Sequence, residues 1–125
     1  MPLNTADTTL LRRVPGIGSY YARQVVQYRQ RLGGFADVAQ LRDIEGFPEQ
    51  ALAYMEVDAT QVRRINLNRL TLDQLRRHPY VNFHQARAIA DYRRLKGPLQ
   101  SLDQLRLLKE FTPADLQRLA PYVEF

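Results

Sequence analysis

The amino-acid sequence repeats itself at an offset of 64 residues, and this repeat restricts the possible folds more than any other feature. The two halves align without a gap. The matching segments include Leu3-Asn4 with Leu67-Asn68, Leu11-Arg12-Arg13 with Leu75-Arg76-Arg77, Ala22-Arg23 with Ala86-Arg87, Tyr28-Arg29 with Tyr92-Arg93, and Gln40-Leu41-Arg42 with Gln104-Leu105-Arg106. Such a repeat indicates duplication of one structural unit. We therefore predict two domains, residues 1–62 and 63–125, joined around residues 56–66 by a short extended or helical connector without Gly or Pro.

Each repeat has the pattern of several short helices. Asp7 can cap a first helix that runs to about Arg13, and a second helix is expected from about Ser19 to Leu32 because its apolar residues recur at spacings of three and four. A third helix, capped by Asp37, and a fourth, starting at Pro48, complete the first unit, and the second unit repeats this order. No segment alternates like a strand. The prediction is an all-α fold of two tandem units of short helices.

Composition excludes several classes of protein. Apolar residues make up 45% of the chain, which is enough for a core, but no apolar run approaches the roughly 20 residues of a membrane-spanning helix. Cysteine is absent, so disulfides, thiol nucleophiles and Cys-ligated zinc are excluded. His78 and His84 lie around a turn without further ligands at a recognisable spacing, and we predict no metal site.

The charge favours an anionic partner. The net charge is +5, and 16 of the 18 basic residues are Arg, which binds phosphate with two parallel hydrogen bonds. The distribution is uneven: residues 1–62 hold six basic and seven acidic side chains, whereas residues 63–125 hold twelve and six. Nucleic acid is therefore one candidate partner, and a solvated basic surface is the alternative.

The segment Pro15-Gly16-Ile17-Gly18 interrupts the first two helices of the first unit. Its glycines leave the backbone bare, and Ile17 is expected to turn back into the core. A tight turn here would present N–H groups at the start of the following helix, where donors and helix dipole favour a phosphate. A purely structural turn between helices is the alternative.

Together these motifs resemble a known family. The segments Leu3-Asn4-Thr5-Ala6-Asp7, Val14-Pro15-Gly16-Ile17-Gly18, Tyr28-Arg29, Gly33-Gly34-Phe35 and Glu45-Gly46-Phe47 are similar to the helix-hairpin-helix module of ComEA-type competence proteins. The resemblance covers residues 3–55 and, through the repeat, 67–119. It implies two paired hairpins per unit, sequence-independent binding of DNA through hairpin amides, and in some hairpins a monovalent cation on the carbonyls, for which the Pro15–Gly18 hairpin is the candidate here. No other cofactor is expected.

Carried over to this sequence, the resemblance implies a binding site at the first hairpin. Its residues would be the amides of Gly16, Ile17, Gly18 and Ser19, the Ser19 hydroxyl, Tyr20 and Arg23. The family often has a Lys two or three residues after the second Gly, where this chain has Tyr20 and Tyr21. In the partner hairpin, Pro48 replaces a second Gly and removes a donor.

The second unit departs further from the family pattern. Pro79-Tyr80-Val81-Asn82 replaces Pro-Gly-Ile-Gly, and the last hairpin, around Phe111, has lost its glycine, so we interpret both as mainly structural. Asn82 tolerates a left-handed backbone, and His84 aligns with Tyr20 and could touch a phosphate. The exposed-face candidates for nucleic acid in this unit are Arg76, Arg77, Arg87 and Arg94, of which the last two can pair with Asp91.

Arg29 and Arg93 recur in an otherwise buried stripe, which favours a structural role such as holding carbonyls or a carboxylate. The tyrosines are expected in the core or at its rim rather than as stacking platforms.

The leading hypothesis is a non-enzymatic protein that binds double-stranded DNA without reading its sequence. The alternative is a protein-interaction or scaffold module that kept the fold and lost DNA binding. Arg side chains around the first hairpin would favour DNA, and Arg side chains paired with carboxylates would favour the alternative. No small-molecule substrate is expected. The motif begins at Leu3, which suggests part of a longer chain, and ComEA-like proteins often lie in the bacterial envelope; a cytoplasmic location is the alternative.

Overall fold

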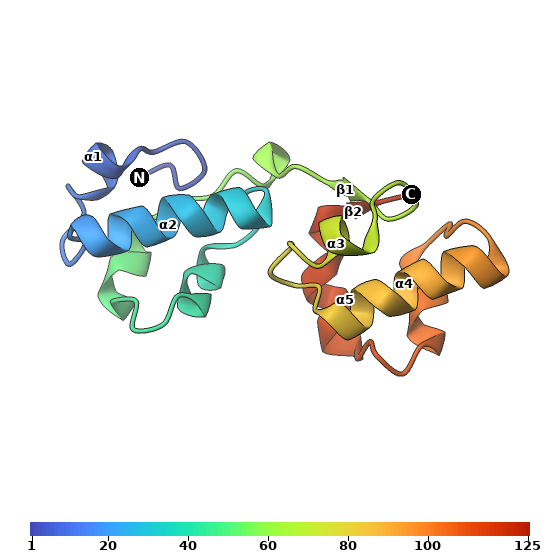
Figure 1. Cartoon of the computed structure of the whole chain (residues 1–125). Helices are drawn as coiled ribbons and strands as arrows, with labels where there is room; N and C mark the ends of the chain where they lie inside the picture. The colour runs from blue at the N-terminus through green and yellow to red at the C-terminus, as the bar shows by residue number, and fades with distance from the viewer. The chain divides into compact units, whose positions relative to one another are not determined.

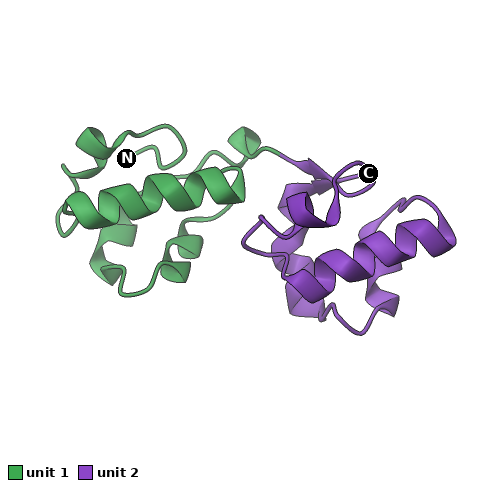
Figure 2. Ribbon diagram, viewed as in Figure 1, with its two compact units in different colours: residues 1–63 green, residues 64–125 purple.

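The structure is a computed structural model that describes all 125 residues (Figure 1). The chain forms two compact units, unit 1 from Met1 to Arg63 and unit 2 from Arg64 to Phe125 (Figure 2). The sequence repeat put this boundary between residues 62 and 63. Each unit consists of short helices around its own core, and the all-α class predicted from the sequence is correct.

Unit 1 contains two α-helices and three 3-10 helices. The bounds are α1 Thr8–Leu11, α2 Ser19–Leu32, η1 Val38–Asp43, η2 Glu49–Tyr54 and η3 Ala59–Gln61. The predicted bounds of α2 are confirmed, and the Asp7 carboxylate accepts the N–H of Leu10 as the predicted cap of α1.

Three expectations for unit 1 need correction. The first helix ends at Leu11 rather than Arg13, because Arg13 and Val14 donate to carbonyls three residues back and tighten the chain into the hairpin. The third and fourth helices are 3-10 helices of six residues each, and this tighter form is common in short connecting pieces. Pro48 lies just before the fourth helix rather than in its first turn.

Unit 2 repeats this order with small differences. Its elements are β1 Ile65–Asn66, α3 Leu72–Leu75, α4 Phe83–Lys96, η4 Leu102–Leu107, α5 Pro113–Leu119, η5 Ala120–Tyr122 and β2 Val123–Glu124. The predicted capping box of Thr71 and Gln74 is present at α3, and α5 is a true α-helix where unit 1 has a 3-10 helix.

Both units close by bringing their two ends together in parallel. In unit 2, β1 pairs with β2 in the register Ile65 with Val123. In unit 1, Pro2 and Glu56 form a single parallel bridge. The sequence did not reveal these strands because two residues are too few to show alternation.

The cores of the two units use equivalent positions. Leu3, Leu11, Ile17, Ala22, Val25, Phe35 and Leu41 are buried in unit 1, and the residues 64 positions later are buried in unit 2: Leu67, Leu75, Val81, Ala86, Ile89, Leu99 and Leu105. The expectation that Ile17 packs inward is confirmed. The gapless repeat therefore preserves one apolar packing pattern.

An asparagine ties the start of each unit to the turn after its long helix. Asn4 donates to the Phe35 carbonyl (2.9 Å) and accepts the Phe35 N–H (2.7 Å). Asn68 makes the same two contacts with Leu99, both at 2.8 Å. Each amide thus pairs both polar groups of one backbone residue, as a strand would.

Arg29 and Arg93 hold backbone carbonyls of the N-terminal loops, which confirms the structural role predicted for them. Arg29 donates to the carbonyls of Leu3 (3.0 Å) and Ala6 (2.7 Å), and Arg93 donates to the carbonyl of Leu70. Burial lowers the pKa of Arg29.

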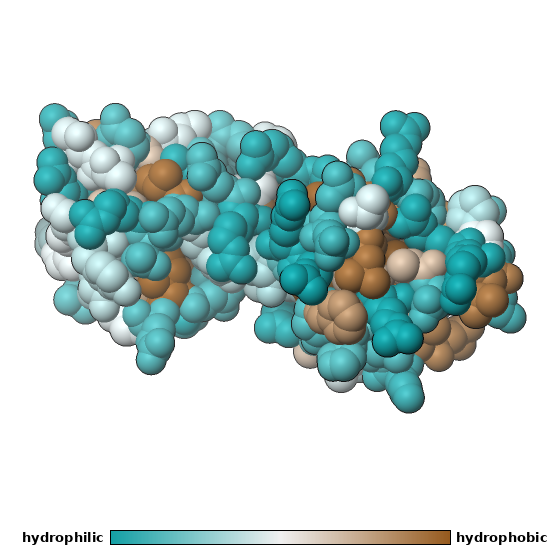
Figure 3. Space-filling view, viewed as in Figure 1, coloured by the Kyte–Doolittle hydropathy of each residue, from teal (hydrophilic) through white to brown (hydrophobic).

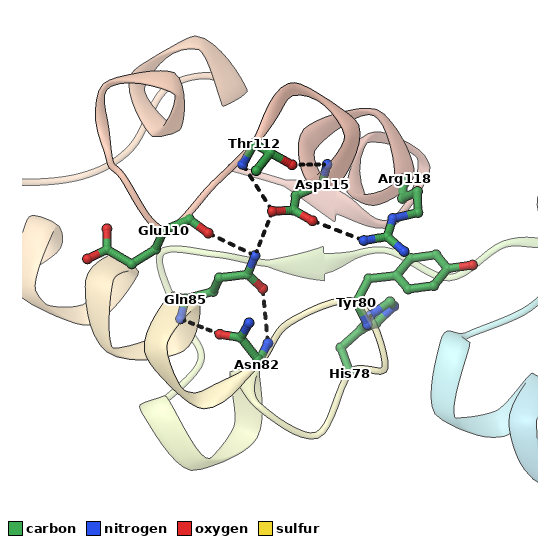
Figure 4. Close-up of polar contacts among 8 residues, drawn as sticks. All are labelled: His78, Tyr80, Asn82, Gln85, Glu110, Thr112, Asp115 and Arg118. Carbon is green, nitrogen blue, oxygen red and sulfur yellow. Dashed lines mark hydrogen bonds and ion pairs between the residues drawn. The ribbon is translucent and has the colours of Figure 1, made fainter. Parts of the chain in front are cut away.

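The two hairpins of each unit are also joined by a hydrogen bond at equivalent positions. In unit 1 the Tyr21 hydroxyl donates to the Gly46 carbonyl (2.7 Å). In unit 2 the Gln85 amide donates to the Glu110 carbonyl (3.1 Å) and to the carboxylate of Asp115 (3.3 Å) (Figure 4). Different side chains therefore make the same connection.

Replacing Arg29 by Met should destabilise the protein, because two part-buried carbonyls lose a charged donor. We expect a loss of about 2 to 3 kcal/mol in the free energy of unfolding, measured by urea denaturation. The matched control is Arg31→Met on the same helix, where the exposed side chain makes no hydrogen bond or ion pair, and it should change stability by less than about 0.5 kcal/mol. Equal losses in the two variants would contradict the structural role.

Asp115 should make unit 2 sensitive to acid. Its pKa is lowered chiefly by the backbone hydrogen bond from Thr112, with further contributions from the Thr112 hydroxyl and Arg118. A carboxyl with a lowered folded-state pKa stabilises the fold above its ordinary pKa of about 4, and this contribution is lost as pH falls through the folded-state value.

Unfolding of the wild type and Asp115→Asn, measured at about pH 6 and about pH 2, tests this. The wild type should lose more stability over this interval than the variant. Asp103→Asn is the matched control, because Asp103 is an exposed carboxylate paired with Arg106 at 3.6 Å, and it should behave like the wild type. An unchanged acid response in Asp115→Asn would refute the assignment.

Candidate nucleic-acid interface

The first hairpin of unit 1 joins α1 to α2 through Val14–Gly18. The Ile17 N–H donates to the Val14 carbonyl (3.0 Å), and Gly16 adopts a left-handed φ of +90°. An L side chain would be strained at that φ. The turn is therefore tight, with Ile17 anchored in the core.

Four backbone donors at this hairpin have no acceptor within the protein. The N–H groups of Gly16, Gly18, Ser19 and Tyr20 make no hydrogen bond, and all four residues are exposed. Gly18 is the N-cap of the 14-residue α2 and has no side chain to satisfy the helix end. The Ile17 amide was also predicted to bind a ligand. This prediction is wrong, because the Ile17 N–H already donates to the Val14 carbonyl.

Gly18 is not required by the fold. Its φ is −93°, which any residue can adopt, and a Cβ there would meet no atom within 4 Å. The absence of a side chain leaves the donors open to a close approach from solvent. This is the arrangement that binds an anion at a helix N-terminus.

Three arginines accompany these donors in the sequence around the hairpin. Arg12, Arg13 and Arg23 are exposed and have no carboxylate within ion-pair distance, and Arg12 reaches the Ser19 hydroxyl at 3.4 Å. The Arg12 guanidinium therefore adds a positive charge beside the unpaired N–H groups.

The equivalent hairpin of unit 2 uses part of its donors internally. The Tyr80 N–H donates to Nδ1 of His78 (3.1 Å), and Asn82 and Gln85 exchange hydrogen bonds as a capping box (3.0 and 2.8 Å) (Figure 4). Asn82 was expected to tolerate a left-handed backbone, yet its φ is −84°, and its side chain caps α4. The free donors at Gly16 and Gly18 of unit 1 therefore have occupied counterparts here, whereas the counterparts of Ser19 and Tyr20, the N–H groups of Phe83 and His84, make no hydrogen bond.

Most arginines predicted for binding in unit 2 form exposed ion pairs. Asp91 lies between Arg87 (3.9 Å) and Arg94 (3.3 Å), as the sequence indicated, and Arg76 lies 3.8 Å from Asp73. Arg77 has no carboxylate partner, and His84 is exposed. Because exposed pairs contribute little energy, these guanidinium groups can exchange a carboxylate for a phosphate.

The two remaining hairpins carry acidic groups at their helix starts. Arg42 forms a bidentate ion pair with Glu49, in which Nη2 lies 2.6 Å from Oε1 and Nε lies 3.2 Å from Oε2. The hydrogen bonds from Arg42 lower the pKa of the Glu49 carboxyl. Thr112 and Asp115 form a capping box at α5. Both features make these hairpins poor sites for a phosphate.

The sequence did not identify two residues of unit 2 that the structure singles out. The exposed ring of Phe83 stands at the position of Ser19, and Gln85 is buried between the hairpins of unit 2. The sequence repeat aligns Phe83 with Ser19 and Gln85 with Tyr21, and this alignment could have identified both residues. No group of three or more His, Cys, Asp or Glu side chains gathers as metal ligands. No helix is both long and apolar enough to span a bilayer.

Comparison with known proteins agrees with this geometry. The family model described as "Helix-hairpin-helix motif" matches twice, at residues 2–57 and 60–124. Proteins named "Endonuclease/exonuclease/phosphatase family domain-containing protein 1" from Mus musculus and Rattus norvegicus are each 26% identical over 94% of this chain, and the Xenopus laevis protein is 23% identical.

The chain spans about a quarter of the length of these relatives, 26% in each case. No solved structure matches significantly. The motif itself is generally associated with sequence-independent DNA binding. Two motif matches that cover nearly the whole chain, each on a unit with paired hairpins, place this protein in the helix-hairpin-helix motif family.

Proposed function

We propose that this protein binds double-stranded DNA without sequence preference and without cleaving it, and that the first hairpin of unit 1 is the principal contact. The observation that carries the proposal is the set of four exposed N–H groups at Gly16, Gly18, Ser19 and Tyr20 that lack acceptors. A phosphate oxygen can accept several of them at once. The contact needs no cofactor, because the donors belong to the backbone.

The arginines supply long-range attraction in this proposal. Unit 1 holds seven basic and seven acidic side chains, whereas unit 2 holds eleven and six. Unit 2 would therefore attract the polyanion, and unit 1 would fix a phosphate on its hairpin. Contacts of both kinds address the DNA backbone, which carries no direct sequence information.

The resemblance to ComEA-type competence proteins supports the same activity. The relatives reported above are named for an endonuclease/exonuclease/phosphatase family domain, and that name describes those proteins. For this chain we propose the DNA-binding part alone.

A protein-interaction module is the second candidate, and unit 2 favours it. The N–H groups of Tyr80 and Asn82 in its first hairpin are used internally, and five of its arginines pair with aspartates. Under this alternative the protein would not bind DNA at low salt.

A fluorescence anisotropy titration of the full chain with blunt duplex DNA tests the proposal. We expect duplexes of unrelated sequence to bind with similar affinity, and the affinity to fall as salt rises, with a log–log slope of about −0.9 for each phosphate contacted. Binding that is absent at low salt, or indifferent to salt, would contradict the proposal and favour the protein-interaction module.

Gly18→Asn separates binding from folding. The new side chain can accept the N–H of Tyr21 and occupy the space that a phosphate would enter, as Asn82 does in unit 2. We expect duplex affinity to fall about five- to tenfold while thermal stability stays the same or rises slightly, because Asn is a good N-cap residue.

Ala59→Asn is the matched control, since it adds the same side chain at an exposed position outside both hairpins of unit 1. It should bind duplex like the wild type. An unchanged affinity in Gly18→Asn would exclude the first hairpin as the principal contact.

A further inference from the structure

The hairpin of unit 2 exposes an aromatic ring where unit 1 exposes a hydroxyl. Phe83 is the first residue of α4, it occupies the position of Ser19 in the repeat, and 43% of its surface is exposed. Apolar side chains reach the surface at several places on unit 2 (Figure 3). Phe83 differs from Leu95 and Leu107, the other exposed apolar residues of the α4–η4 region, in its surroundings.

The side chains of Arg76 and His84 contact this ring, and two further arginines are close to it in the sequence. The guanidinium carbon of Arg76 lies 5.8 Å from the ring centroid, and the His84 ring meets it edge-on at 5.7 Å. Arg77 is exposed without a carboxylate partner, and Arg87 follows Phe83 by one helical turn. The acidic groups nearby are Asp73, 3.8 Å from Arg76, and Asp91, 3.9 Å from Arg87, both in weak exposed pairs.

Two of the four N–H groups proposed to bind a phosphate in unit 1 have occupied counterparts in this hairpin, and the other two, at Phe83 and His84, make no hydrogen bond. The Tyr80 N–H donates to the His78 side chain, and the N–H groups of Asn82 and Gln85 donate to each other's side chains (Figure 4). The hairpin therefore keeps fewer free amides than its counterpart in unit 1 and adds an exposed ring and guanidinium groups. A ligand that joins a flat apolar group to a phosphate can contact both the Phe83 ring and the guanidinium groups.

We propose that Phe83, with Arg76, Arg77 and Arg87, forms a stacking site for an unpaired nucleobase. DNA with a single-stranded segment would then bind more tightly than a blunt duplex. This inference rests on the DNA binding proposed above and adds a preference among DNA structures. Base stacking on an aromatic side chain tolerates any sequence because every base has a π-face.

An unpaired base fits this site better than a base pair does. A base inside a duplex must be unstacked before it can contact Phe83, and that cost is least for a base that is already single-stranded. The flanking arginines can hold the phosphates on either side of the stacked base. A protein partner would also cover an exposed ring, but the cluster of arginines favours a polyanion.

The experiment compares three DNAs in anisotropy titrations of the full chain: a blunt duplex, the same duplex with a single-stranded overhang, and that overhang with abasic sites. The abasic overhang keeps the phosphates and removes the bases. We expect the wild type to bind the normal overhang at least about fivefold more tightly than the blunt duplex, and to lose most of this gain with the abasic overhang.

Phe83→Ala should remove the preference for the overhang and leave blunt-duplex affinity unchanged, whereas Phe83→Trp should keep the preference. Leu95→Ala is the matched control, because Leu95 is 73% exposed near the other end of α4, about 18 Å away. Thermal unfolding verifies that each variant is folded.

The outcomes separate the two proposals. Equal binding of the blunt and overhang duplexes, or a loss in Phe83→Ala that is the same for every DNA, overturns the stacking site while duplex binding stands. Equal affinity for the normal and abasic overhangs also overturns it, because phosphates alone would then explain the gain. Absence of binding to every DNA overturns both.

Discussion

Each unit depends on side chains that satisfy backbone groups in segments without regular structure. The helices are short and the loops between them are long, so many N–H and C=O groups have no partner in a helix or sheet. Asn4 and Asn68 pair with the backbone of Phe35 and Leu99, and Arg29 holds two carbonyls of the first loop. These bonds fix the loops against the long helix. The loops that precede the hairpins are thereby attached to the core of each unit.

The first hairpins of the two units use equivalent backbone N–H groups in different ways. In unit 1 the amides at Gly16 and Gly18 are free, while in unit 2 the equivalent amides of Tyr80 and Asn82 donate to the side chains of His78 and Gln85. Internal bonds of this kind stabilise the turn, but they remove the donors that a phosphate would need. Stability and anion binding draw on the same N–H groups, so one hairpin cannot have both in full.

The charge distribution follows the same separation. Arg12, Arg13 and Arg23 of unit 1 have no carboxylate partner and lie in sequence around its first hairpin, whereas five of the eleven basic residues of unit 2 pair with aspartates. Exposed pairs are weak and exchange with other anions at little cost. The excess charge in unit 2 is therefore compatible with attraction of a polyanion even though part of its hairpin backbone is occupied.

The sequence alone determined the two units, the all-α class, the bounds of α2, and the structural use of Arg29 and Arg93, because a gapless repeat and helical spacing depend only on the order of residues. It also pointed to the first hairpin. Tertiary structure decided which amides are free: the occupation of the Ile17, Tyr80 and Asn82 N–H groups depends on the folded turn and on side-chain rotamers. It also decided the 3-10 form of the short helices, the two-residue strands that close unit 2, and the exposure of Phe83, since each results from packing between segments distant in the chain.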